Sequence, residues 1–187
     1  FMLDKISPVL AYETNTDEKL LLLCLQETTT ERVGQIRELV QQSIDWSQFA
    51  QLAVRHKVVG PVYWTLKYHI ENQLPPEALT DLQRYFRIIM TMNLSLSAEL
   101  LKLSELFKQN NIPFVSIKGP ILAQALYEKP HLRQFSDLDI LIPEQNYPAA
   151  RQVLLDVGFR HDFEEHIKMP NYTKDFQRDY HEAFLNR

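Results

Sequence analysis

The sequence predicts an α+β protein, in which an all-helical N-terminal region packs on a small mixed sheet with flanking helices. From about Asp17 to Gln109 apolar side chains recur at intervals of three and four, and glycine is scarce, which is the helical pattern. After Asn110-Asn111, short runs of strand-forming residues alternate with short helical segments. We therefore predict a helical region at 1–110 and an α/β core at 111–187.

Two helices are well defined by the pattern of the helical region. Asp45 is a suitable N-cap for an amphipathic helix that carries Trp46, and Gly60-Pro61 predicts where that helix ends. A long helix is predicted over 77–108, where one apolar stripe has Asn93 as its lone polar member. Such a stripe can also form a coiled-coil dimer, but we expect it to pack against the chain's own helices.

In the α/β core the predicted order is strand, helix, strand, helix. The first strand covers 114–117 and leads into a helix at 120–127 that is opened by a proline. The second strand covers 135–142, and the amphipathic helix after it ends at Gly158. The side chains of that helix expected to face inward are Ala149, Val153, Leu154 and Val157. A last helix is predicted near 176–185.

The candidate functional residues are the acids Asp137 and Asp139 on the second predicted strand. Alternate side chains of a strand share a face, so the two carboxylates should be neighbours. Like charges that close raise one pKa, and a shared Mg²⁺ or Mn²⁺ would relieve the repulsion. The solvated side of an edge strand gives the same alternation. The strand-to-helix turn at Lys118-Gly119 favours the metal interpretation, because it adds a candidate phosphate site.

Two segments carry a resemblance to a known family. They are Ser116-Ile117-Lys118-Gly119-Pro120 and, after a helix, Arg133-Gln134-Phe135-Ser136-Asp137-Leu138-Asp139-Ile140-Leu141-Ile142-Pro143. In the helical half, Asp45-Trp46 and the segment 55–59 add to the match. The chain resembles the uncharacterised nucleotidyltransferase family within the polymerase-beta-like superfamily. The resemblance implies that the small sheet is nucleotidyltransferase-like.

The resemblance also implies an activity: transfer of a nucleoside monophosphate from a nucleoside triphosphate such as ATP to an unknown acceptor. Asp137 and Asp139 would be the catalytic acids that bind magnesium or manganese. Gly119 would be the glycine of the phosphate turn and Lys118 would lie at the phosphates. Arg133 would either bind the triphosphate or brace the strand that carries the acids.

The sequence departs from the family pattern at two places. Pro120 follows the turn glycine where the superfamily often has glycine or serine, so one N–H donor is lost. The family has a third carboxylate on a later strand, and this chain ends at Arg187 before it. We therefore expect an N-terminal fragment of a longer protein, or a short form that lacks one ligand. In-chain substitutes would be Asp162, Glu164 and Glu165.

Composition limits the other classes of function. The net charge is −4 with mixed signs, which argues against long duplex nucleic acid as a partner. No run approaches the roughly 20 apolar residues that span a bilayer, and the single Cys24 fits a reducing compartment. We expect a cytoplasmic protein. The rival functions are a catalytically inactive nucleotide-binding or protein-interaction module, and a helical scaffold whose small α/β part is structural.

Overall fold

The computed structural model describes residues 15–127, 129–161 and 184–185, and the chain divides into two compact units. The first unit runs up to Ala98 and also includes Lys118–Leu138. The second unit consists of Glu99–Ile117 and the chain from Asp139 onward. The long helix α5 (Thr80–Gln109) contributes residues to both. The helix predicted over 77–108 is confirmed from Thr80 onward, whereas the residues before it form a 3-10 turn (Pro76–Leu79).

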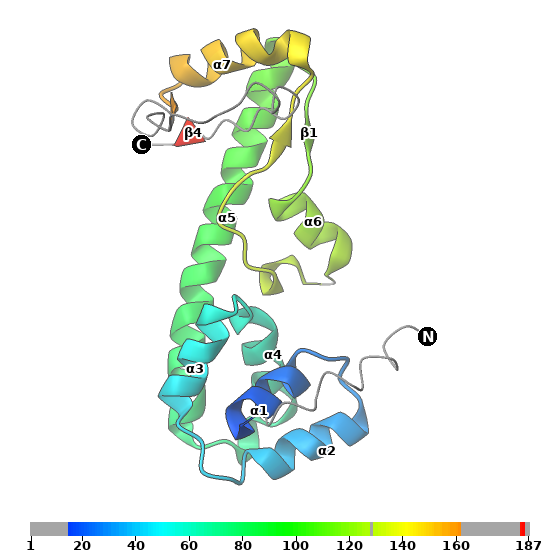
Figure 1. The fold of residues 1–187 in the computed structure, drawn as a ribbon, viewed down its shortest axis with the longest axis vertical. Helices are drawn as coiled ribbons and strands as arrows, with labels where there is room; N and C mark the ends of the chain where they lie inside the picture. The colour runs from blue at the N-terminus through cyan, green and yellow to red at the C-terminus, as the bar shows by residue number, and fades with distance from the viewer. Residues whose placement is uncertain (1–14, 128, 162–183, 186–187) are drawn as a thin grey trace, which may run out of the picture. The chain divides into compact units, whose positions relative to one another are not determined.

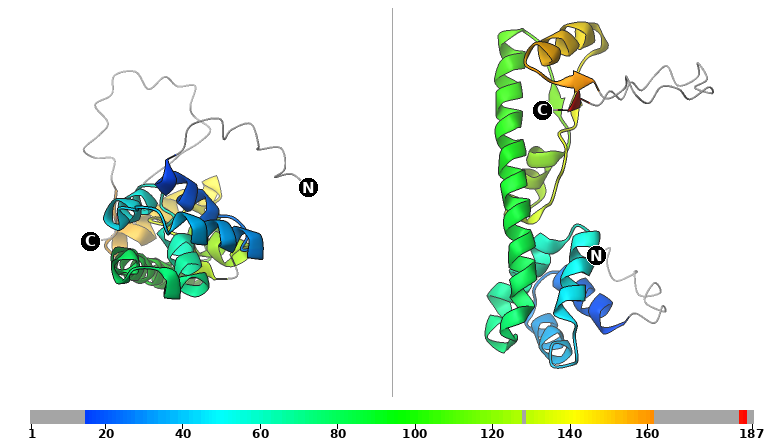
Figure 2. Two further views of the ribbon diagram at one scale, coloured as in Figure 1. Left: turned by 90° about the horizontal axis from the view of Figure 1, so that it is seen from below. Right: turned by 90° about the vertical axis from the view of Figure 1, so that its left-hand side faces the viewer.

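Helices dominate the first unit. Its elements are α1 (Thr16–Cys24), α2 (Thr30–Leu39), α3 (Trp46–Arg55), α4 (Val59–His69), the 3-10 turns η2 (Glu71–Gln73) and η3 (Pro76–Leu79), the start of α5, α6 (Gly119–Leu126) and the 3-10 turn η4 (Pro130–Leu132). Helix α1 contacts α2, α3 and α4. Figures 1 and 2 show these four helices gathered around the N-terminal part of α5. Along the described residues, none of the helices has the length and apolar character to span a bilayer.

The start of α3 confirms the predicted cap, whereas its end does not follow the prediction. Asp45 accepts a hydrogen bond from the backbone N–H of Gln48 at 3.0 Å, which satisfies one of the free amides of the first turn. The predicted end at Gly60-Pro61 is wrong, because both residues lie in the first turn of α4. Gly60 has a packing role instead. A Cβ atom there would lie 2.3 Å from the carbonyl oxygen of Leu132 in η4, so only glycine allows this approach.

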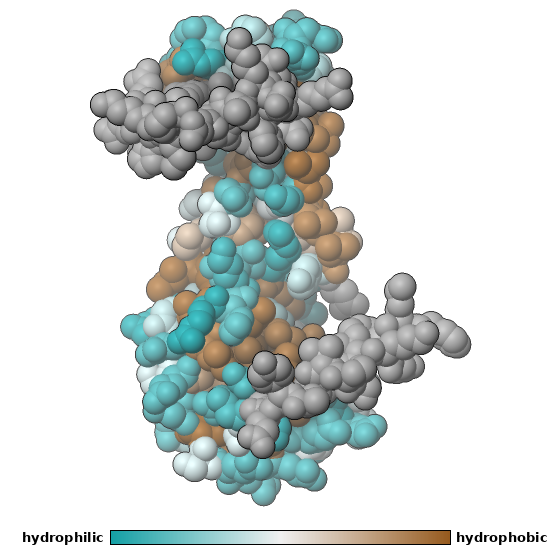
Figure 3. Space-filling view, in the orientation of Figure 1, coloured by the Kyte–Doolittle hydropathy of each residue, from teal (hydrophilic) through white to brown (hydrophobic). Residues whose placement is uncertain are grey.

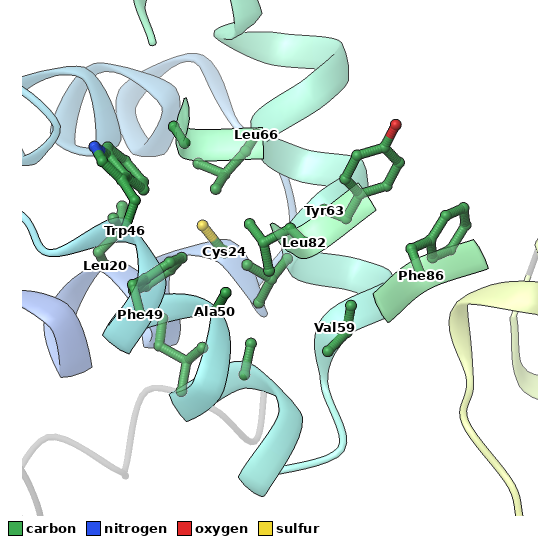
Figure 4. Packing of buried hydrophobic residues seen from close by; sticks show 14 of the residues in the cluster. Leu20, Cys24, Trp46, Phe49, Ala50, Val59, Tyr63, Leu66, Leu82 and Phe86 are labelled. Carbon is green, nitrogen blue, oxygen red and sulfur yellow. The ribbon is translucent and has the colours of Figure 1, made fainter. Parts of the chain in front are cut away.

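The core of the first unit is a single apolar cluster drawn from α1 to α5. Leu20, Phe49 and Leu82 have no measurable exposure, and Figure 4 shows them packed around Cys24. Trp46 meets Phe49 edge to face, with ring centroids 5.8 Å apart. Burial raises the pKa of the Cys24 thiol to about 12, so this cysteine is a packing residue rather than a nucleophile.

The second unit contains the described strands. Strand β1 (Val115–Ser116) pairs antiparallel with β2 (Ile140–Leu141), and β3 (Arg160–His161) pairs antiparallel with β4 (Phe184–Leu185). The 3-10 turn η5 (Glu144–Asn146) leads into α7 (Tyr147–Asp156). The buried apolar residues of this unit are Leu100, Leu103, Phe107, Ile112, Ala150 and Leu154. The cross-strand pair Val115 and Leu141 is exposed, and Figure 3 shows apolar surface over β1.

The α+β class is confirmed in its coarse form, as a mostly helical chain with small antiparallel pairs of strands. Several local predictions in the second half are corrected. The strand predicted over 135–142 is present only at Ile140–Leu141. In α7 the buried residues are Ala150 and Leu154, whereas the predicted inward residues Ala149 and Val157 are exposed. Val157 lies beyond the last helical turn and is 51% exposed. The helix predicted near 176–185 is wrong at Phe184–Leu185, which form β4, and its earlier part lies outside the described residues.

Candidate nucleotide site

A cavity of about 220 Å³ in the first unit brings together segments that are far apart in the sequence. Its lining residues are Lys57, Lys118, Gly119, Arg133, Gln134, Phe135, Ser136 and Asp137. Three basic residues and one acidic residue therefore line this space, and the excess of positive charge favours an anionic ligand. Four of the five predicted site residues line the cavity. The fifth, Asp139, lies two residues further along the chain, in the second unit.

Gly119 has the conformation that the predicted phosphate turn requires. Its φ is +60°, in the left-handed region that favours glycine. A Cβ atom at this position would lie 3.3 Å from the carbonyl oxygen of Asp137 and 3.6 Å from Leu138 Cδ2. Helix α6 begins at this glycine, and its N-cap, Lys118, makes no capping hydrogen bond with its side chain. Because glycine has no side chain, the turn can lie in close contact with the segment that carries Asp137.

Arg133 is both a lining residue and part of the local bracing. Its Nη1 donates a hydrogen bond to the carbonyl oxygen of Gly119 at 3.4 Å. The guanidinium has further N–H groups that can bind phosphate. Arg133 therefore braces the glycine turn, whereas the predicted bracing was of the strand that carries the acids; its role at the triphosphate stays a prediction.

Asn93 positions the segment that follows Arg133, and sequence reasoning missed this role. This residue is 5% exposed on α5. Its Nδ2 donates to the carbonyl oxygen of Arg133 at 2.9 Å, and its Oδ1 accepts from the N–H of Phe135 at 3.5 Å. The signal was present in the sequence, because a polar residue in a buried stripe requires hydrogen-bond partners. What the sequence could not give was the identity of those partners, 40 and 42 residues away.

Asp137 and Asp139 do not lie together on a regular strand. Asp137 is an exposed residue at a bend, and β2 begins after Asp139. The carbonyl oxygen of Asp139 accepts from the N–H of Ile117 at 3.1 Å, so the ladder between the two strands extends to this residue. Strand alternation therefore applies from Asp139 onward and gives no argument at Asp137. The residue between them in the chain, Leu138, is half-buried.

The described residues contain no group of three or more His, Cys, Asp or Glu side chains that could hold a metal ion. The three in-chain substitutes for the third carboxylate, Asp162, Glu164 and Glu165, lie outside the residues that the structure describes. Gln134 contributes a different kind of group to the cavity. Its Oε1 is buried and has no hydrogen-bond partner among the described residues. A ligand hydroxyl or amino group could satisfy it.

Trp64 on α4 is a second aromatic surface suited to stacking a base, and its ring already has partners. Tyr68 stacks on Trp64 with ring centroids 3.9 Å apart, and the Lys129 ammonium lies 4.5 Å from the Trp64 ring centroid. His131 is 5.9 Å from the same ring, and burial, with the nearby Lys129 charge, lowers its pKa. We therefore place the candidate ligand in the cavity and not against Trp64.

Comparison with known proteins adds the family. A family model described as uncharacterised nucleotidyltransferase matches residues 42–187. The chain belongs to this family. The searches of curated proteins and of solved structures found no match. Every lining residue of the cavity falls inside the nucleotidyltransferase match, including Lys57 of the helical region.

Proposed function

We propose that this chain binds a nucleoside triphosphate in the cavity and takes part in the transfer of its nucleoside monophosphate to an acceptor. The observation that carries the proposal is the joint lining of one cavity by Lys118, Gly119, Arg133 and Asp137. A left-handed glycine turn at a helix start, flanked by two cations, is suited to phosphate oxygens. The carboxylate beside them is suited to a cation that accompanies those phosphates.

In the proposed reaction a hydroxyl or amine of the acceptor attacks the α-phosphorus. A new bond forms between that oxygen or nitrogen and the phosphorus, and the bond from the phosphorus to the α,β-bridging oxygen breaks. Pyrophosphate leaves with the electron pair, and the acceptor loses its proton to solvent. Lys118 and Arg133 bind the β- and γ-phosphates and stabilise the charge that develops on the leaving group. The residues of the cavity do not select a particular acceptor.

The donor set at the cavity fits magnesium or manganese. Mg²⁺ in nucleotide enzymes is held by one or two carboxylates together with substrate phosphates and water. Asp137 is exposed at the cavity beside the phosphate-binding cations, and Asp139 follows two residues later. When bound, the ion supplies charge neutralisation to the triphosphate. We propose Asp137 and Asp139 as its protein ligands. Both belong to the α/β core that we propose for residues 111–187, with a nucleotidyltransferase-like sheet.

Calorimetry with ATP and Mg²⁺ tests the site. Binding should require both components, and Asp137→Asn or Asp139→Asn should abolish the dependence on Mg²⁺. Glu38→Gln is the matched control, because it removes one negative charge from an exposed position of α2 outside the cavity. If the heats of ATP and Mg²⁺ binding were the same in both Asp variants and in the control, the proposed metal site would be refuted.

Catalysis is tested separately from binding. Release of pyrophosphate from ATP, measured with and without candidate protein or RNA acceptors, reports turnover. ATP binding that depends on Mg²⁺ without any pyrophosphate release would instead favour the alternative function, a catalytically inactive nucleotide-binding or protein-interaction module. The absence of binding to ATP and to the other nucleoside triphosphates would refute the proposed function.

A further inference from the structure

Lys57 occupies a backbone position that ordinarily belongs to glycine. It follows the C-cap of α3 and has a φ of +58°. Its N–H donates to the carbonyl oxygen of Val54 at 3.0 Å, and the N–H of Val58 donates to that of Ala53 at 2.9 Å. This pair of bonds is the Schellman motif, in which the residue after the C-cap takes the left-handed conformation.

Two other helices end with the same motif and show which residues suit it. At the end of α5, Asn111 has a φ of +55°, and at the end of α7, Gly158 has a φ of +96°. The backbone bonds are equivalent in both cases. Glycine and asparagine are the residues that tolerate this conformation, whereas a lysine Cβ is crowded by the backbone. The fold of the turn therefore does not explain why residue 57 is a lysine.

The cavity does supply a reason. Lys57 lines it together with Lys118 and Arg133, although it comes from the helical region and they come from a segment at least 61 residues later. Among the described residues Lys57 has no ion pair and no side-chain hydrogen bond. The two backbone bonds of the turn hold its Cα in place, so the residue stays at the rim of the cavity that Lys118 and Arg133 also line.

We infer that Lys57 is a third phosphate-binding cation of the nucleotide site, contributed by the helical region. The inference rests on the proposed function, since it names a further ligand-binding residue of the same cavity. A triphosphate carries more negative charge than two cations neutralise, and a third cation improves the electrostatic match. The crowded backbone at residue 57 is then a local strain retained at a functional position.

The test compares binding and thermal stability in the same variants. Lys57→Asn removes the charge and keeps a residue that suits the left-handed turn. Binding of ATP and of inorganic triphosphate should weaken by about 10-fold to 100-fold, as expected for the loss of a charged contact. Binding of adenosine should not change. The midpoint of thermal unfolding should stay the same or rise by up to about 4 °C, because the crowding is relieved. Lys57→Arg should retain affinity for triphosphate.

Two controls separate charge and turn conformation from contact with the ligand. Arg55→Gln removes a cation from the exposed last turn of α3, outside the cavity, and should leave affinity for ATP unchanged. Asn111→Lys places a lysine in an equivalent left-handed position and should lower the unfolding midpoint without weakening binding. If the wild-type chain binds ATP and Lys57→Asn binds it equally well, the inference is wrong. If the wild-type chain binds neither ATP nor triphosphate, the proposed function fails and this inference fails with it.

Discussion

The substitution Asn93→Leu tests whether the Asn93 side chain holds the backbone of Arg133 and Phe135, two residues that line the cavity. Leucine has a similar size and preserves the helix, but it removes the donor to the Arg133 carbonyl and the acceptor for the Phe135 N–H. A buried polar group left without a partner costs about 1–3 kcal/mol. We assign this cost to the Arg133 carbonyl, whose bond is 2.9 Å long. The 3.5 Å bond to Phe135 is at the outer limit of hydrogen bonding and adds little.

The added apolar surface of leucine offsets part of this loss by about 1 kcal/mol. The expected net decrease in the free energy of unfolding is therefore up to about 2 kcal/mol. Urea unfolding followed by the fluorescence of Trp46 and Trp64 measures it, since both lie in the first unit. Affinity for ATP should also fall, because the loosened segment carries Arg133 and precedes Asp137.

Asn93→Asp sharpens the test through its dependence on pH. The carboxylate can still accept from Phe135, but it opposes the Arg133 carbonyl oxygen, and burial should raise its pKa. A carboxyl group with a raised folded-state pKa loses its stabilising contribution as pH rises. This variant should therefore be less stable at pH 8 than at pH 5, relative to wild type. Ser97→Ala is the control, because Ser97 donates only to the Asn93 backbone oxygen. If Asn93→Leu matched wild type in both unfolding and ATP binding, the bracing role would be refuted.

Three further predictions concern packing, the phosphate turn and alkaline stability. Gly60→Ala should lower the free energy of unfolding by about 1–3 kcal/mol, because the new methyl group collides with the Leu132 carbonyl. By contrast, Gly34→Ala, in open space within α2, should raise it by about 0.5–1 kcal/mol, and equal effects in urea unfolding would contradict the packing argument. Gly119→Ala should cost about 1–2 kcal/mol through its positive φ and should weaken ATP binding, so wild-type affinity in calorimetry would count against the turn. Burial raises the pKa of Cys24 from 9.0 to about 12, so the unfolded thiol ionises first and stability is lost as pH rises through this window. The loss should be about 1 kcal/mol between pH 9 and 10, and Cys24→Ala should remove that share of the slope in urea unfolding at each pH.

The parts of the fold and site that could be predicted from the sequence depend on interactions between residues close together in the chain. Asp45 caps α3 because its side chain bonds an amide three residues later, and α5 follows from an apolar stripe within one segment. The Lys118-Gly119 turn was also predictable, since a glycine between a strand and a helix indicates a backbone conformation that other residues avoid. Each of these depends on neighbours close in the sequence.

Other features depend on partners that are distant in the sequence. The end of α3 was misplaced because Gly60 serves contact with Leu132, 72 residues later, and not a helix stop. The strand predicted over 135–142 was too long because alternation of residue types does not show where a pairing partner ends, and β1 offers only Val115–Ser116.

The sequence by itself determined the family, the helical front half and the motif residues Lys118, Gly119, Arg133, Asp137 and Asp139, because these follow from local pattern and residue chemistry. Only the tertiary structure decided that Lys57 shares a cavity with four of those residues and that Asn93 holds the backbone beside them. Side chains from separate segments become neighbours only when the buried core fixes the path of the chain. That path is a property of many weak contacts acting together, and no single motif encodes it.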